Sequence, residues 1–214
     1  MSGVQPSELY KYLESRHVKS LLRGEVRVRN LRAYQELEHL GLAVGDPNEG
    51  TSTVLLRDGV MSGESLRPFF DAPAGATLDV RDCAEHTIHT DLYAVCFSSV
   101  KSGELMSRFS EENVRAGGEP YDACVEIVAP AKFARGLAVR TAANGLRYRG
   151  WGACDYAEQP EVPAGPLRAA LYKGPDYAWQ MEVRLVFQGR HQARSLIVAA
   201  PELGEYLREV RIER

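Results

Sequence analysis

The stretch "WQMEVRLVF", from Trp179 to Phe187, places an apolar residue at every second position. Alternation at this period predicts a half-buried β-strand whose apolar and polar side chains lie on opposite faces. Gln180, Glu182 and Arg184 would then share the polar face. That face has two interpretations: a solvated surface on which Glu182 and Arg184 pair in water, or the floor of a cleft. We expect the cleft, with Arg184 or another cation keeping Glu182 ionised.

Strand-like and helix-like segments follow one another irregularly along the rest of the chain. Apolar or alternating runs predict strands at 9–13, 25–30, 92–99, 121–129, 146–158, 193–201 and 207–214. Helical spacing and cap signals predict helices at 15–23, 31–40, 102–113, 130–136 and 165–174. We therefore predict an α+β fold, with a mixed and mainly antiparallel sheet and short helices, in a single domain spanning residues 1–214.

Residues 41–91 depart from this pattern. The runs "GDPNEG" and "RPFFDAPAGAT" concentrate residue types that favour turns, and Asp58-Gly59 predicts a hairpin. The segment is neither long enough nor biased enough for an independent domain or a disordered tail. We expect it to be an insertion or a lid within the single domain.

Composition and charge narrow the function classes. A net charge of -3, without a long run of one sign, argues against a broad nucleic-acid-binding surface, although the arginines of "RGEVRVRNLR" leave room for a local basic groove. The N-terminus lacks the apolar segment of a signal peptide, and no stretch reaches the length of a membrane span. We expect a cytoplasmic protein that does not contact membranes and whose four cysteines are reduced.

Four short elements occur in one order along the chain: Tyr10-x-Tyr12, Asp46-Pro47-x-Glu49, Cys96-Phe97-Ser98 and Trp179-x-x-Glu182-x-Arg184. This order resembles a large family of bacterial and phage proteins that carries a domain-of-unknown-function label, over roughly Leu9 to Phe187. The chain departs from the family's pattern at two points. It lacks the usual Phe-Asn before Asp46, and it has Met106-Ser107 where the family tends to have Met-Trp. More remotely, the layout is similar to ADP-ribosyltransferases, whose Gln-x-Glu pattern Gln180 and Glu182 resemble.

The resemblance implies an ADP-ribosyltransferase-like fold and an enzyme that uses NAD as a substrate to modify a macromolecular target. Cleavage of the nicotinamide–ribose bond builds positive charge on the ribose, which a nearby carboxylate stabilises. Glu182 would be that carboxylate, Gln180 would reach the acceptor, and Ser98 would hold Glu182 or the ribose. The remaining contacts to NAD would come from Tyr10 and Tyr12 by stacking, from Arg27 and Arg29 at the pyrophosphate, and from Ser99 and Tyr177.

Each of these residues also has an ordinary structural interpretation, as a strand end, a solvated strand face or part of the core. The alternative function is accordingly a non-catalytic module of a phage or bacterial defence system that binds a nucleotide or a protein. A nucleic-acid-processing enzyme is a third class, which the acidic net charge disfavours. Cys83, His86 and His89 are spaced by three residues, but no second pair of ligands accompanies them, so we expect no metal site.

Overall fold

The computed structural model describes residues 6–33, 50–55, 59–62, 77–80, 84–157, 165–190 and 193–213. Eight strands from these residues form the main sheet. They are β1 (Leu9–Leu13), β2 (Glu25–Asn30), β7 (Leu92–Ser98), β8 (Ala123–Ile127), β9 (Arg147–Ala153), β12 (Glu182–Gln188), β13 (Ser195–Ala199) and β14 (Leu207–Val210). Every pairing between them is antiparallel, while the short strands β10 (Asp155–Tyr156) and β11 (Tyr172–Lys173) pair in parallel. The described chain is thus α+β with a mainly antiparallel sheet, as predicted.

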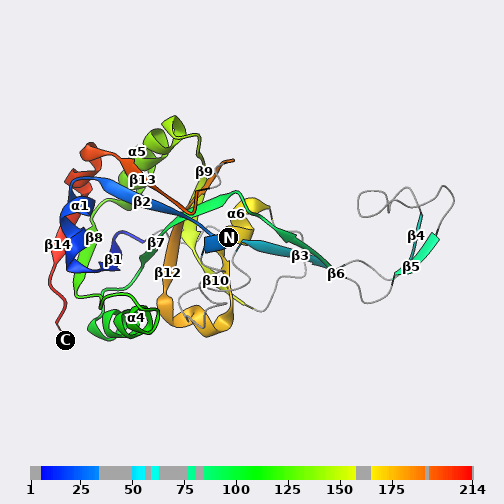
Figure 1. Ribbon diagram of the computed structural model, residues 1–214, viewed down its shortest axis with the longest axis horizontal. Helices are drawn as coiled ribbons and strands as arrows, with labels where there is room; N and C mark the ends of the chain where they lie inside the picture. Colours follow the sequence, from blue (N-terminus) through cyan, green and yellow to red (C-terminus); the bar gives the residue numbers. More distant parts are fainter. Residues whose placement is uncertain are drawn as a thin grey trace.

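Strand β7 lies at the centre of the sheet, and its two edges differ. Along one edge it pairs with β12 over its whole length, from Leu92 opposite Gln188 to Ser98 opposite Glu182. The other edge is shared, because β2 pairs near the start of β7 and β1 pairs at Ser98. The sheet therefore divides beside β7 into two arms, β2–β13 and β1–β8–β14 (Figure 1).

One face of this sheet carries the main core. Tyr93, Val95 and Phe97 of β7 and the alternate residues of β12 point to it, because side chains alternate along a strand. Among the described residues, three helices cover this face: α1 (Val18–Leu22), α5 (Pro130–Ala143) and the 3-10 helix η3 (Pro201–Tyr206). Phe133 of α5 packs edge-on against Phe97, with ring centroids 5.8 Å apart.

The opposite face of the sheet carries two smaller apolar clusters. Helix α4 (Gly103–Arg115) contributes Leu105 and Met106 to one of them, which also includes Tyr10 and Tyr12 of β1. Helix α6 (Pro166–Leu171) contributes Ala170 to the other, against β7 and β12. The polar residues of β12 lie on this second face.

Strands from the segment 41–91 form two separate two-stranded sheets outside the main sheet. Strand β3 (Thr51–Leu55) pairs with β6 (Ala84–Ile88), and β4 (Gly59–Ser62) pairs with β5 (Thr77–Val80). Figure 1 shows both pairs extending away from the sheet. The hairpin predicted at Asp58-Gly59 is wrong, because β3 and β4 pair with later strands and not with each other.

The predicted strand from Trp179 to Phe187 also needs correction. Its first part is the 3-10 helix η2 (Pro175–Gln180), and Met181 has a left-handed backbone with φ 45° and ψ 45°. Strand β12 begins only at Glu182. Proline opens η2 with a helical φ, and the left-handed backbone at Met181 separates this helix from β12, so the alternation of Trp179 and Met181 with Val183 does not reflect one strand.

Two helix predictions differ from the structure, and one segment lies outside it. Ser15 begins the 3-10 helix η1 (Ser15–His17) without acting as a cap, and its backbone N–H donates to Asp122. Helix α5 runs seven residues past the predicted end at 136, to Ala143. Most of the helix predicted at 31–40 lies outside the described residues. None of the described helices has both the length and the apolar character needed to cross a bilayer.

Gly24 joins α1 to β2 at a point where a side chain has no room. Its φ is +78°, and a Cβ there would lie 2.0 Å from the carbonyl oxygen of Ala200. Gly117 has nearly the same φ, +76°, but open space around its Cα. We expect Gly117→Ala to cost about 1 kcal/mol of unfolding free energy, the price of a left-handed alanine, and Gly24→Ala to cost about 2–4 kcal/mol. Urea unfolding of both variants measures this, and equal losses would show that the close approach to Ala200 is irrelevant.

Candidate functional site

Three residues that are distant in the sequence meet on one row of the sheet. Ser98 at the end of β7 lies directly opposite Tyr10 of β1 on one side and Glu182 of β12 on the other. Side chains directly opposite each other in antiparallel strands have Cβ atoms about 4.5–5.5 Å apart and point to the same face. We call Tyr10, Ser98 and Glu182 the central row.

Glu182 lies at the centre of a buried ionic cluster with Arg184 and Lys173. Its Oε1 accepts a hydrogen bond from Nε of Arg184 at 2.7 Å, and its Oε2 accepts one from Nζ of Lys173 at 2.9 Å. Arg184 also donates from Nη1 to the backbone carbonyl of Ala170 in α6, at 2.7 Å. The exposed fractions of Glu182, Lys173 and Arg184 are 6%, 2% and 0%. The solvated interpretation of this polar face is therefore wrong.

The two cations fix the charge of Glu182. Burial alone would raise the pKa of its carboxyl, but Arg184 and Lys173 outweigh burial and hold that pKa well below its usual range. The carboxylate is thus ionised throughout the physiological pH range. The expectation that Arg184 keeps Glu182 ionised is confirmed, and Lys173 is the second cation.

Gln180 enters the same cluster by a route that the sequence pattern did not predict. It ends η2, turns into the interior at the left-handed Met181, and accepts a hydrogen bond from Nζ of Lys173 at 2.6 Å. Its exposed fraction is 2%, and its Nε2 has no hydrogen-bond partner in the part of the chain that the structure describes. Ser99 holds the turn, because its backbone N–H and its Oγ both donate to the carbonyl of Met181, at 2.9 and 3.1 Å.

Lys11 lies at the division of the sheet. The carbonyl of Cys96 falls between the β2 and β1 pairings of β7, and Nζ of Lys11 donates to it at 2.8 Å. Burial lowers the pKa of the Lys11 ammonium; Glu182 opposes this effect, and Arg29 and Arg27 add to it. Lys11 therefore lies within electrostatic range of both the carboxylate and the two arginines. Arg27 is exposed and Arg29 is half-buried.

The two tyrosines of β1 are core residues with satisfied hydroxyls. Tyr12 donates to the carbonyl of Val100 at 2.6 Å and accepts from the backbone N–H of Ser102, and its ring packs 5.7 Å from Phe109. Tyr10 donates to Glu8 at 2.7 Å. Tyr177 is placed differently, since Nζ of Lys173 lies 5.1 Å from its ring centroid. Lys11 lies between the two tyrosines on β1 and points to the opposite face of the strand.

The structure thus brings together some of the predicted residues and separates others. Glu182, Gln180 and Ser98 lie together, with Tyr10 beside Ser98, Ser99 at the Met181 turn and Tyr177 against Lys173. Tyr12 belongs to the aromatic cluster under α4, and Arg27 and Arg29 lie on the other arm of the sheet. Asp46, Glu49 and Cys83, together with the side chain of His86, lie outside the described residues.

Sequence reasoning missed three members of the site. Lys173 bridges Gln180 and Glu182, because its Nζ donates to both side chains. Tyr156 accepts a hydrogen bond from the backbone N–H of Glu182 at 2.6 Å, and Cys154 donates its own backbone N–H to the Glu182 carbonyl at 2.8 Å. Only the "LYK" run before the proline gave a signal, because an isolated lysine after two apolar residues needs a partner when it is buried.

The thiol and carboxylate groups of the site do not form a nucleophilic or metal centre in the described residues. Burial raises the pKa of the Cys96 thiol to about 12, so the thiol is protonated at neutral pH. Cys96, Cys124 and Cys154 are free thiols. Within the described ranges, no group of three or more His, Cys, Asp or Glu side chains is placed to hold a metal ion.

No family model, curated protein or solved structure matches the chain. The resemblance to the bacterial and phage family and to ADP-ribosyltransferases therefore stays a prediction, and the function has to be argued from the geometry.

Proposed function

We propose that this protein is an ADP-ribosyltransferase-like enzyme that cleaves NAD and transfers ADP-ribose to a macromolecule. The observation that carries the proposal is the central row, because Tyr10, Ser98 and Glu182, the residues that the sequence predicts at the NAD site, come from three separate strands and lie opposite one another. Lys11 adds a cation near the row, because its Nζ donates to the carbonyl of Cys96, two residues before Ser98.

Cleavage of NAD at the central row requires a carboxylate that stays ionised during the reaction. As the bond between nicotinamide and C1′ of the ribose breaks, nicotinamide leaves with the bonding electrons and positive charge grows on the ribose ring. A carboxylate beside the ring stabilises this charge more strongly in the transition state than in the ground state. Glu182 would be this carboxylate, because its lowered pKa keeps it ionised. The hydroxyl of Ser98 would position a ribose hydroxyl next to it.

The test is an assay of NAD turnover. The folded protein is incubated with NAD labelled in its adenylate phosphate and with a cell lysate, and released nicotinamide is measured together with label on macromolecules. We expect release of nicotinamide and labelling of a macromolecule. If folded protein gives neither, the transferase proposal is wrong.

One observation favours the second candidate, a nucleotide-binding module without catalysis. The carboxylate of Glu182 is already occupied by Lys173 and Arg184, and Ser98 has an exposed fraction of 2%. A substrate would have to displace one of these contacts before reaching the carboxylate. Calorimetric titration with NAD separates the candidates, since saturable binding without nicotinamide release supports the module and release excludes it.

A further inference from the structure

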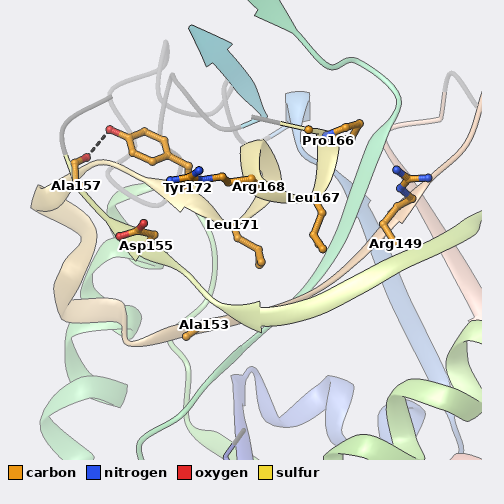
Figure 2. A pocket seen from close by; sticks show the side chains of 10 residues that line it. Arg149, Ala153, Asp155, Ala157, Pro166, Leu167, Arg168, Leu171 and Tyr172 are labelled. Atoms are coloured by element: carbon orange, nitrogen blue, oxygen red, sulfur yellow. Dashed lines mark hydrogen bonds between the residues drawn. The ribbon is translucent and has the colours of Figure 1, made fainter. Parts of the chain in front are cut away.

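A separate cavity lies between α6 and the edge strand β9. Its volume is about 550 Å³, within the range of about 300–1,000 Å³ that is typical of small-molecule sites. Leu167 and Leu171 of α6 and Ala153 of β9 line its apolar part, as Figure 2 shows. None of its lining residues belongs to the central row or to the ionic cluster of Glu182.

Glycines on β9 set the shape of this apolar part. A Cβ on Gly150 would lie 2.9 Å from Cδ2 of Leu167, and a Cβ on Gly152 would lie 3.2 Å from Cδ1 of Leu171. The missing side chains let the two leucines rest directly on the backbone of the strand. The apolar part of the cavity is therefore made of leucine side chains that rest on the strand, an apolar surface against which a planar ring can pack.

Within the described residues, the charged side chains at the rim of the cavity have no protein partner. Arg149, Arg168 and Asp155 all line it, and no hydrogen bond or ion pair joins their side chains to other residues in the described ranges. Two other arginines of the surface, Arg140 and Arg208, do pair with carboxylates, those of Glu202 and Glu126. The rim thus offers two guanidinium groups and one carboxylate to a ligand.

We infer that this cavity binds a nucleoside monophosphate. Its apolar part matches the base, the Asp155 carboxylate accepts hydrogen bonds from the ribose hydroxyls, and Arg149 or Arg168 binds the phosphate. The carboxylate argues against a ligand with only anionic groups, which it would repel, and the guanidinium groups argue against a nucleoside without phosphate. The inference does not rest on the proposed function, because the two sites share no residue.

The experiment is calorimetric titration of the full chain with AMP, adenosine and inorganic phosphate. We expect AMP to bind at least tenfold more tightly than adenosine or phosphate alone. Arg149→Ala and Arg168→Ala should each weaken AMP binding, and the double variant should weaken it at least tenfold. Arg135→Ala, on the exposed side of α5, is the matched control and should leave it unchanged.

Each result supports or contradicts binding of a nucleoside monophosphate in the cavity. If AMP does not bind at millimolar concentration, or binds equally to wild type and to the double arginine variant, the inference is wrong. Equal affinity for AMP and adenosine also overturns it, because the guanidinium groups then make no contact with phosphate. The readout is binding of AMP. A folded protein that does not turn over NAD would therefore contradict the proposed function without contradicting this inference.

Discussion

Replacing Glu182 with glutamine is expected to lower the free energy of unfolding by about 3–5 kcal/mol. The change keeps the shape of the side chain but removes the only charge that the ionic cluster places between Lys173 and Arg184, whose exposed fractions are 2% and 0%. Two buried cations would then face a neutral amide, whose N–H groups cannot accept from them. Urea unfolding at pH 7 measures the loss.

Glu126→Gln is the control for this variant. Glu126 is equally buried on the same face of the sheet, but its partner Arg208 has a side chain that is 65% exposed and can return to water. We expect its loss to be about 1 kcal/mol, within the range of exposed ion pairs. If Glu182→Gln costs no more than Glu126→Gln, the ionic cluster does not stabilise the fold in the way that its burial indicates.

The stability difference between wild type and Glu182→Gln should depend on pH, because the pKa of Glu182 differs between the folded and the unfolded state. Burial would raise this pKa, but Arg184 and Lys173 lower it below the value of 4.5 for a free glutamate, so the folded state keeps the carboxylate ionised to lower pH than the unfolded state does. The contribution of Glu182 is then complete above about pH 5 and is lost as the pH falls below the unfolded value. The difference in stability between wild type and Glu182→Gln should be constant from pH 6 to 8 and should shrink below about pH 4.5.

The sequence predicted the faces of the strands better than their partners. Alternation in "EVRVRN" and in "EVRLVF" correctly places Val26 and Val183 in the core, because burial of one face imposes a period of two. Which strands lie beside β7 depends on contacts between residues far apart in the chain. No local pattern contains the register that sets Ser98 between Tyr10 and Glu182.

The polar face of β12 shows where local pattern reasoning stops. Alternation grouped Gln180 with Glu182, and the two side chains do meet, but through Nζ of Lys173 and not along one strand. This arrangement requires a left-handed backbone at Met181, which a methionine does not signal, since such positions usually hold glycine or asparagine. The buried ammonium of Lys173 is the group that makes the meeting favourable.

The catalytic assignment of Glu182 can be separated from its structural role by comparing two variants. Glu182→Gln and Lys173→Met both break the 2.9 Å ion pair and both disturb the same buried cluster. Only the first removes the carboxylate that the proposed mechanism places beside the ribose. Release of nicotinamide from NAD is measured for both variants, per mole of folded protein and at a temperature at which both are folded.

We expect Glu182→Gln to reduce nicotinamide release by about 10²–10³-fold, the size of effect seen when one group that stabilises transition-state charge is removed. Lys173→Met should reduce it by less than about tenfold, because Arg184 still holds and orients the carboxylate through Nε. Equal losses in the two variants would mean that the intact ionic cluster, and not the charge of Glu182 on the ribose, supports turnover. Glu182 would then have a structural role only, and the carboxylate that stabilises the charge on the ribose would have to be sought elsewhere in the chain.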